Sequence, residues 1–445
     1  MISTRTLQLA FQGKDITSTT MNAAIEDWFQ LYYLQEATKT EDPCQQIPFT
    51  IVRKLTKATF SEYMAHSKNE FAGQVLKALQ NVQGSAAQHA FIGGMCMLKP
   101  LPEKTCFSFS VVRRDKMLIF GRNHKGQVTD IGTWERTVQG RYYYTLLERR
   151  TVDANGFLTI KNVLYRSYTE SDLGSQIPLS TLEQYANFQE VYTFREPIGS
   201  VGLIPVTIPV ENCVDGGEDA VSVYAAATGL IHNINRNEAQ LNGEFERGKS
   251  KIMASADMFK KNKDGARTVA DDVFVTLDED PETMGITIFS PALRETSYLA
   301  RKQDYLRSVE NIIGLKRGLL SEVEAVERTA KEITSSEGDY NLTITDLQKM
   351  WESSAREALR VCGILGRLYQ IPGATDIPED AVVFNWGNGV LFDEEKTRAQ
   401  MLSEVQAGLL QPERYVGFVY KQPCETAAQR EKIRKDYMPQ QIEEE

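Results

Sequence analysis

The pattern of apolar and polar positions is most regular in the middle of this 445-residue chain, where two helical stretches flank an acidic insert. The first stretch runs from about Glu218 to Lys251, and its apolar positions share one narrow stripe: Val221, Tyr224, Thr228, Ile231, Ile234, Leu241 and Phe245. The second runs from about Pro291 to Ile313, with Ser290 as a predicted N-cap. Helices with so little apolar surface cannot be enclosed in a monomer core, so we expect neighbouring copies to cover them.

The insert between these helices, Asp257 to Ser290, contains two strand candidates, Val273–Leu277 and Ile286–Phe289. The acidic residues between them are typical of a turn, which predicts a hairpin. A single hairpin is too small to be stable alone. We therefore expect it to pair with a strand from another subunit.

The residues before this region predict helices followed by an antiparallel sheet. Met21, Ile25, Trp28 and Tyr32 have helical spacing, and two more amphipathic runs follow Pro48 and Glu70. From Phe107 the pattern alternates with a period of two, in the strand candidates 107–111, 117–120, 126–136, 141–150 and 157–165. The tight turn 153–156 indicates that consecutive strands pair as an antiparallel meander, which closes near 201–206. Helices together with an antiparallel sheet make the predicted fold class α+β.

After the second central helix comes a loop, Gly314 to Ser321, and then more helix. A helix is predicted from Val326 to Thr334, a bend at Ser335–Asp339, and a continued helix to about Tyr369. Two short helices, 394–408 and 413–437, precede the acidic end of the sequence.

Composition and charge limit the classes of function. Hydrophobic residues make up 42% and charged residues 25%, as in a soluble folded protein. No apolar run approaches the ~18 residues that span a bilayer, and the first residues lack the layout of a signal peptide, so we expect the protein to stay where it is made. A formal net charge of −10 argues against a conventional DNA binder, although an acidic protein can handle DNA that must slide past it.

Cysteine and histidine positions predict no metal site. The six cysteines are scattered without C-x-x-C spacing, and the four histidines form no paired motif. Acidic residues of the insert can ligate Mg²⁺ for nuclease chemistry, but no local histidine or lysine accompanies them and a solvated acidic face is favoured. These residues are Asp271, Asp272, Asp278, Glu279, Asp280 and Glu282.

One segment, Gly243 to Ser250, matches the phosphate-loop pattern G-x-x-x-x-G-K-[ST]. A working phosphate loop follows a buried strand, whereas here an amphipathic helix precedes it. Glu244 and Glu246 would also repel a phosphate. The common catalytic motifs do not occur in the sequence, and we expect neither an enzyme nor a cofactor.

The loop after the second helix combines two cations with three leucines: Leu315, Lys316, Arg317, Gly318, Leu319, Leu320 and Ser321. One reading is an ordinary connection between helices. Leucines exposed in a loop instead indicate a contact surface. If the loop points into the hole of a ring, Lys316 and Arg317 are placed to contact a DNA backbone.

In the order of its parts the sequence resembles the portal proteins of tailed double-stranded DNA bacteriophages, particularly the siphophage branch called minor capsid proteins. The resemblance rests on five segments of the sequence: the helix 21–33, Glu244–Ile252, Phe289–Arg294, Arg328–Ile333 and Glu404–Leu410. Most of the chain is covered.

The resemblance implies a homo-oligomeric ring, usually of twelve subunits, at one capsid vertex. It implies a wing (1–216), a first stem helix (217–256), a small α/β clip (257–290), a second stem helix (291–313), a tunnel loop with a long wing helix (314–392) and a helical crown (393–445). The insert is short, so the clip is expected to be minimal.

The partners implied by the resemblance follow from this arrangement. The clip, including the six acidic residues above, would dock the terminase large subunit and later the head–tail adaptor. The loop 315–321 would contact double-stranded DNA independently of its sequence. Major capsid and scaffolding proteins are further expected partners, without a membrane, and the virion is the expected location after assembly in the host cytoplasm.

Two alternatives stay open. The first is another structural capsid or connector protein, which the subunit count and a central channel would distinguish. The second is an enzyme, either a P-loop NTPase or a metal nuclease, which ATP-dependent turnover by the pure protein would reveal.

Overall fold

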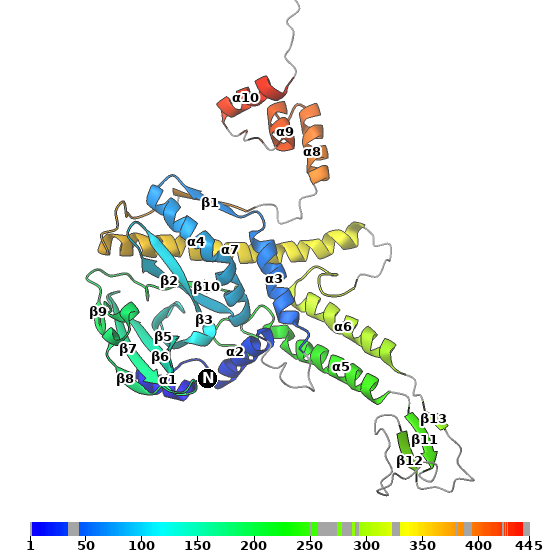
Figure 1. Cartoon of the computed structure of the whole chain (residues 1–445). Coiled ribbons are helices and arrows are strands. Elements are labelled where there is room, and N and C mark those ends of the chain that lie inside the picture. The colour runs from blue at the N-terminus through cyan, green and yellow to red at the C-terminus, as the bar shows by residue number, and fades with distance from the viewer. Residues whose placement is uncertain are drawn as a thin grey trace, which may run out of the picture. The chain divides into compact units, whose positions relative to one another are not determined.

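The computed structural model describes residues 2–33, 44–248, 251–255, 274–277, 287–289, 293–322, 330–378, 381–386, 394–420, 422, 424 and 426–438. The chain divides into two compact units, Met1–Asn385 and Trp386–Glu445. Helices and antiparallel sheets both occur in the first unit, and the second is helical (Figure 1), which makes the fold class α+β. None of the described helices has a stretch long and apolar enough to cross a membrane.

The first unit begins with four helices: α1 (Thr4–Phe11), α2 (Thr19–Tyr32), α3 (Ile47–Phe60) and α4 (Glu70–Gly93). Side-chain caps start three of them: Ser3 accepts a hydrogen bond from Thr6 N, Ser18 accepts one from Met21 N, and Asn69 accepts one from Ala72 N. Met21, Ile25 and Trp28 are buried, which confirms the predicted core stripe of α2.

The predicted meander forms the larger sheet of the first unit. Its strands are β4 (Met117–Arg122), β5 (Val128–Gln139), β6 (Tyr142–Val152), β7 (Leu158–Ser167) and β8 (Ser175–Ile177), in that order, with β9 (Val191–Thr193) also paired to β7. A second sheet has the order β10-β2-β3, with β2 (Met95–Pro102), β3 (Phe107–Arg113) and β10 (Ile204–Thr207). All these pairs are antiparallel.

The two sheets share an apolar core. It contains Met95, Met97, Met117, Ile119, Ile131, Val201 and Leu203. A second cluster packs α1 against the larger sheet through Leu7, Phe11, Leu118 and Leu147. Burial of these side chains holds α1, the meander and the smaller sheet together.

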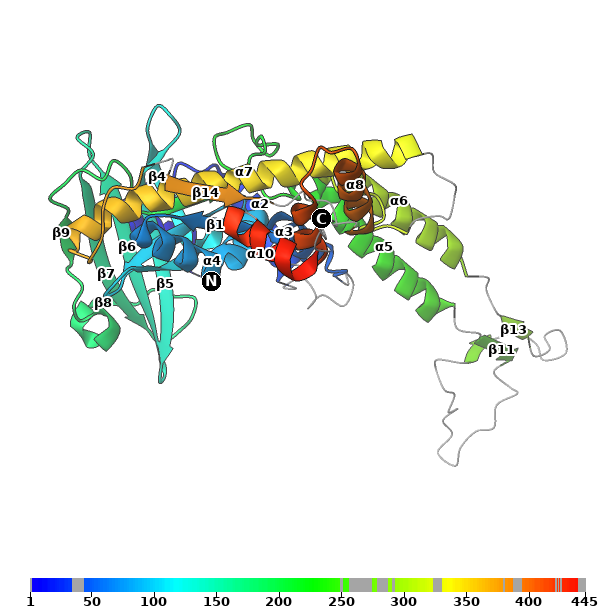
Figure 2. The ribbon, with the colours of Figure 1, turned by 90° about the horizontal axis from the view of Figure 1, so that it is seen from above.

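The 39-residue helix α7 (Ala330–Leu368) crosses this unit and packs against α3, α4 and β10 (Figure 2). Its buried residues include Trp351, Ala355, Ala358 and Val361. After it, β14 (Val382–Asn385) pairs with β1 (Met64–Ser67). The bend predicted at Ser335–Asp339 is wrong, because the helix runs through it. One glycine and two serines lower helix propensity by less than the packing of so long a helix contributes.

The first central helix begins later than the sequence predicts. The structure has a short 3₁₀ turn, η5 (Ala225–Ala227), and then α5 (Thr228–Arg247). Residues Val221 and Tyr224 belong to the core of the body instead, where the Tyr224 hydroxyl donates to Trp28 O at 2.9 Å. The second helix, α6, spans Glu295–Ile313. It starts after the predicted Pro291, which lies with Ser290 outside the described residues.

The insert forms a small sheet rather than the predicted hairpin. Its strands are β11 (Lys251–Ser255), β12 (Phe274–Leu277) and β13 (Thr287–Phe289), in the order β12-β11-β13. The central strand β11 is parallel to β12 and antiparallel to β13. The predicted helix to Lys251 is therefore wrong at its end. The partner strand that a lone hairpin needs comes from the same chain.

The second unit contains α8 (Glu394–Gln406), α9 (Pro412–Val419) and α10 (Ala427–Tyr437). The helix predicted at 394–408 is confirmed apart from its bounds, but the single helix predicted at 413–437 is wrong, because that stretch forms the two helices α9 and α10. The Arg434 guanidinium pairs with the buried Glu413 carboxylate. A capping box at Thr426 and Gln429 starts α10.

A buried ionic cluster links the two sheets of the first unit. The Glu148 carboxylate on β6 accepts from Lys99 Nζ on β2 at 2.7 Å and from Arg150 Nε at 2.7 Å. Burial alone would raise the pKa of the Glu148 carboxyl, but the charges of Arg150 and Lys99 lower that pKa to about 2. Arg150 also donates to Val201 O at 3.1 Å.

Replacing the Glu148 carboxylate should make the free energy of unfolding less dependent on pH in the acidic range. At pH 7, Glu148→Gln should lower the free energy of unfolding by about 3 kcal/mol, because Lys99 and Arg150 stay buried without their anion. The folded-state pKa lies below the ordinary value of 4.5, so this stabilisation is present above about pH 4.5 and lost as the pH falls toward 2. Urea unfolding of both proteins between pH 7 and pH 2 measures the difference. The exposed Glu196→Gln is the control, and a gap between wild type and Glu148→Gln that stays constant down to pH 2 would contradict the prediction.

Candidate functional site

Helices α5 and α6 lie side by side and lead to the small sheet at their far ends (Figures 1 and 2). We call α5 and α6 the helix pair. The buried apolar residues of the pair are few: Ile231, Ile234 and Leu241 on α5, and Leu306 and Val309 on α6. The predicted narrow stripe is confirmed over these residues of α5.

Polar contacts fix the two helices to each other. Lys302 Nζ pairs with Glu238 Oε2 at 2.8 Å, and the Arg294 guanidinium binds both carboxylate oxygens of Glu244, at 3.0 and 2.7 Å. Asn237 Nδ2 donates to Tyr298 O at 3.0 Å. Bidentate arginine pairs set orientation as well as distance, so the helices are held in one register.

Contacts also join the helix pair to the N-terminal helices. Lys302 Nζ donates to Gln45 Oε1 at 3.0 Å, and Gln45 N donates to Asn235 Oδ1 at 2.9 Å. His232 Nε2 lies 3.1 Å from Asp27 on α2. The base of the pair is thus anchored to the body.

The loop after α6 is a folded turn built around a buried carboxylate. Gly314 has φ 74° and ends the helix, a conformation that glycine adopts without strain, and Leu315 N donates to Glu310 O at 2.8 Å. The Glu310 side chain is fully buried, and its carboxylate accepts from Gly318 N at 3.2 Å, Leu320 N at 2.5 Å and Ser321 N at 2.9 Å. Ser321 Oγ adds a fourth bond at 2.7 Å. We call residues 314–322 the Glu310 turn.

The predicted DNA-contacting residues have different surroundings in this turn. Leu315 and Ser321 are buried, Lys316, Leu319 and Leu320 are half-buried, and only Arg317 and Gly318 are exposed. Lys54 Nζ on α3 donates to Leu319 O. The prediction of an exposed leucine tip is therefore wrong, because the turn folds over Glu310. Residues 323–329 lie outside the described residues.

The six acidic residues predicted for docking, Asp271, Asp272, Asp278, Glu279, Asp280 and Glu282, also lie outside the described residues. Across the ranges that are described, no group of three or more His, Cys, Asp or Glu side chains is placed to hold a metal ion. Gly243 to Arg247, the start of the phosphate-loop pattern, belong to α5.

Sequence reasoning missed Glu310, which is the best-satisfied polar side chain of this region. The signal was present: a glutamate falls next to Val309 on the buried side of α6, four residues before the glycine that ends it. An acid at such a position needs internal hydrogen-bond donors, and a glycine-containing loop provides free backbone N–H groups.

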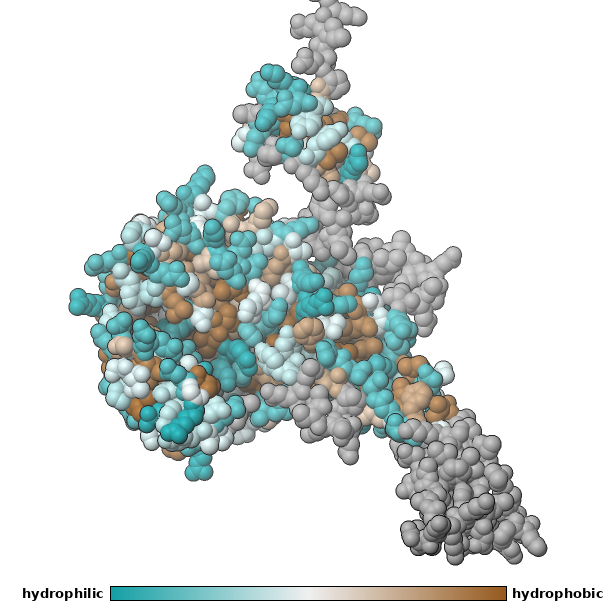
Figure 3. Space-filling view, viewed as in Figure 1, coloured by the Kyte–Doolittle hydropathy of each residue, from teal (hydrophilic) through white to brown (hydrophobic). Residues whose placement is uncertain are grey.

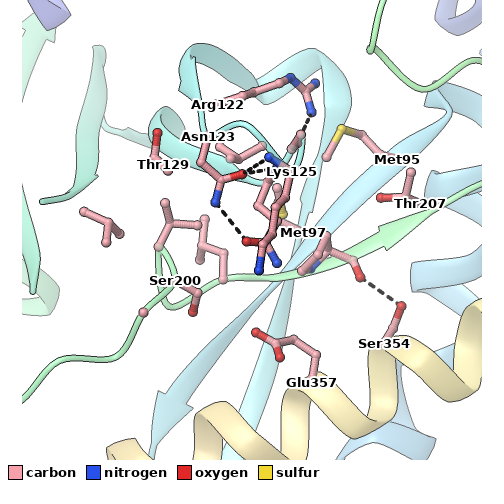
Figure 4. A pocket seen from close by; sticks show the side chains of 18 of the residues that line it. Met95, Met97, Arg122, Asn123, Lys125, Thr129, Ser200, Thr207, Ser354 and Glu357 are labelled. Carbon is pink, nitrogen blue, oxygen red and sulfur yellow. Dashed lines mark hydrogen bonds between the residues drawn. The ribbon is translucent and has the colours of Figure 1, made fainter. Parts of the chain in front are cut away.

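The body also contains a cavity of about 600 Å³ between the sheets and α7 (Figure 4). Two hydrogen bonds involve side chains of its lining: Asn123 Nδ2 donates to Gln127 Oε1 at 2.9 Å, and Ser354 Oγ donates to Pro205 O at 2.8 Å. Neither histidine nor cysteine is among the lining residues. The first bond stabilises the β4–β5 hairpin, and the second joins α7 to β10.

The chain was compared with family models, with curated proteins and with solved structures. No family model matches the chain, and no curated protein matches it. Among solved structures, a chain from the neck of a native GTA particle, computed with C12 symmetry, is similar with a TM-score of 0.45 and 12% identity. The likeness covers 93% of this chain and 98% of that chain.

Removing the Glu310 carboxylate should unfold the turn. Glu310→Ala leaves the amides of Gly318, Leu320 and Ser321 buried without an acceptor, so we expect a loss of about 3 kcal/mol in the free energy of unfolding. Hydrogen–deuterium exchange should become faster across residues 315–322.

The control for this prediction is Glu322→Ala, which removes an exposed carboxylate from the last residue of the turn and should leave exchange unchanged. Equal exchange in the wild type and Glu310→Ala would show that the carboxylate does not hold the turn.

Proposed function

We propose that this chain is the subunit of a portal-type ring, the channel at one capsid vertex through which double-stranded DNA is packaged and ejected. The order of parts carries the proposal: an α+β body, α5, a small sheet, α6, a folded turn and a 39-residue helix that returns to the body. The resemblance puts a wing, a first stem helix, a clip, a second stem helix, a tunnel loop and a long wing helix in the same order.

Exposed apolar side chains on the helix pair support assembly with neighbouring copies. Leu299 is 45% exposed and Ile312 is 49% exposed, and Phe245 and Leu293 are each 41% exposed near the far ends of the helices. Hydrophobic surface is visible at those ends in Figure 3. Apolar side chains grouped on an otherwise polar pair of helices are typical of a surface that another protein covers.

The partners of the proposed ring follow from its parts. The small sheet is the proposed docking site for the terminase large subunit and later for a head–tail adaptor. Major capsid and scaffolding proteins would contact the body, and a non-enzymatic subunit without a cofactor would leave the energy of packaging to the motor. The virion vertex is the proposed location.

The pure full-length chain should form rings with a central channel. We expect negative-stain images and mass photometry at micromolar concentration to show one large species. Leu299→Glu places a charge on the exposed face of α6 and should shift the protein toward monomers. Leu9→Glu, at a 72% exposed position of α1, is the matched control and should leave the ring intact.

Two outcomes would contradict this proposal. A stable, well-folded wild-type monomer would remove the need for neighbours. Closed particles without a channel would favour another structural capsid or connector protein.

The phosphate-loop pattern should bind no nucleotide. Isothermal titration of ATP into the wild type and Lys249→Ala should give no heat of binding in either, because Gly243 to Arg247 use their backbone amides within a helix. Micromolar ATP binding that disappears in Lys249→Ala would favour the NTPase alternative.

A further inference from the structure

A surface cluster of two tyrosines and two arginines lies at the end of the larger sheet where β5 turns into β6. Tyr142 and Arg166 stand on one face of this sheet, because Tyr144, two positions after Tyr142, pairs directly with Arg166 on β7. Tyr168 directly follows β7, and Arg141 directly precedes β6. We call Arg141, Tyr142, Arg166 and Tyr168 the tyrosine–arginine cluster.

Ring and guanidinium contacts hold these four side chains together. The rings of Tyr142 and Tyr168 lie 4.8 Å apart between their centres, and their hydroxyl oxygens are 3.3 Å apart. The guanidinium of Arg166 lies 4.8 Å from the centre of the Tyr142 ring. The guanidinium of Arg141 lies 5.3 Å from the same centre and donates to the Tyr142 hydroxyl at 3.3 Å. An aromatic ring orients a guanidinium without neutralising its charge.

The base of the cluster is fixed in the body, and its outer part reaches solvent. Tyr142 is half-buried and packs against an apolar core cluster that contains Tyr144, Leu146 and Leu164. Its ring also contacts that of Tyr144, with 6.3 Å between the centres. Tyr168 is 65% exposed, and both arginines of the cluster are exposed. Because the side chains are already ordered, this surface loses little freedom when another molecule binds to it.

The two arginines of the cluster carry unneutralised charge. In the part of the chain that the structure describes, their guanidinium groups contact tyrosine side chains and pair with no carboxylate. Other arginines of the same sheet differ, because Arg149 pairs with Asp130 at 2.7 Å and Arg150 pairs with Glu148 at 2.7 Å. The chain as a whole has a net charge of −10. A local excess of positive charge on such a protein is complementary to an anion that another molecule supplies.

We propose that the tyrosine–arginine cluster is a docking site for an acidic segment of a partner protein. Tyrosine and arginine are enriched at the energetic centres of protein interfaces, where the ring supplies contact area and the guanidinium binds a carboxylate. Carboxylates of the partner would bind Arg141 and Arg166, and an apolar side chain between them would pack on Tyr168. The cluster belongs to the body, so this docking does not depend on the proposed ring.

A nucleic acid fits the cluster less well than an acidic segment does. Glu170 and Asp172 are exposed in the loop between Tyr168 and β8, and they would repel a long polyanion. Phosphate backbones are bound by many cations together, whereas the cluster presents two. A short acidic segment can place one carboxylate on each arginine and leave the surface before it meets these acids.

The test measures binding of three probes to the full-length chain by fluorescence anisotropy. The first probe is a labelled peptide of glutamates and aspartates interspersed with leucines, the second is the same peptide with every acid replaced by its amide, and the third is a random-sequence DNA duplex. Arg141→Gln with Arg166→Gln removes both charges of the cluster. Arg5→Gln with Arg195→Gln removes two exposed charges elsewhere on the body and is the matched control. Tyr168→Ala removes an exposed ring and no charge.

The wild type should bind the acidic peptide and not its amide form. The cluster double variant should bind the acidic peptide at least about tenfold more weakly, and Tyr168→Ala should also bind it more weakly although its charge is unchanged. The control double variant should match the wild type, and binding of the DNA duplex should be the same in all four proteins. Mass photometry should show the same species for every variant.

Five results would overturn the docking site. They are a wild type that binds neither peptide, equal binding of both peptides, an equal loss in the control double variant, unchanged binding by Tyr168→Ala, and a loss of DNA binding confined to the cluster double variant. A smaller species confined to the cluster double variant would also overturn it, because the cluster would then be an interface between copies of this chain. The ring proposal stands or falls separately, on the images of the wild type.

Discussion

The packing of α7 against the body is the contact on which the arrangement of the first unit depends. Trp351 is almost fully buried, and its ring meets that of Phe60 on α3 edge to face at 5.4 Å. A helix of 39 residues is ~58 Å long, so one rigid element crosses the first unit, and Gly314 of the Glu310 turn lies beside Thr343 of this helix. Ser354 fixes its position by donating to Pro205 O on β10. The path of the chain after the helix pair is set by this one interaction.

The sequence predicts the meander and the helices well where short-range rules decide the structure. The turn at Asp153–Gly156 has its expected hydrogen bond, and the strand pairs β5–β6 and β6–β7 follow from alternation. The errors occur where tertiary contacts override a local pattern. Val221 and Tyr224 fit a helical stripe, but both fill the body core, so the helix begins only at Thr228. The strand β11 looked like a helix end because its pairing partners lie far along the chain.

In the candidate site, the types of residue along the sequence did not predict which side chains are exposed. Exposure depends on where each residue lies in the folded chain. The cations and leucines of the loop 315–321 are real features of the sequence, yet their exposure depends on Glu310, whose burial no local pattern shows. The charge balance of the helix pair was equally hidden, because it depends on which acid lies beside which base across two helices. On the larger sheet, Arg166 likewise differs from Arg149 in its surroundings and not in its chemistry.

The small sheet has a consequence for how this protein tolerates change. Its first residue, Lys251, pairs directly with Phe289, the last residue of β13, so the chain enters and leaves the sheet at neighbouring positions. Adjacent antiparallel strands lie only about 4.8 Å apart, which clamps the end of α5 near the start of α6 whatever lies between. A module whose two ends meet can be lengthened, shortened or exchanged without moving the helices that carry it. Evolution can therefore alter this end of the molecule while the rest of the chain stays constant.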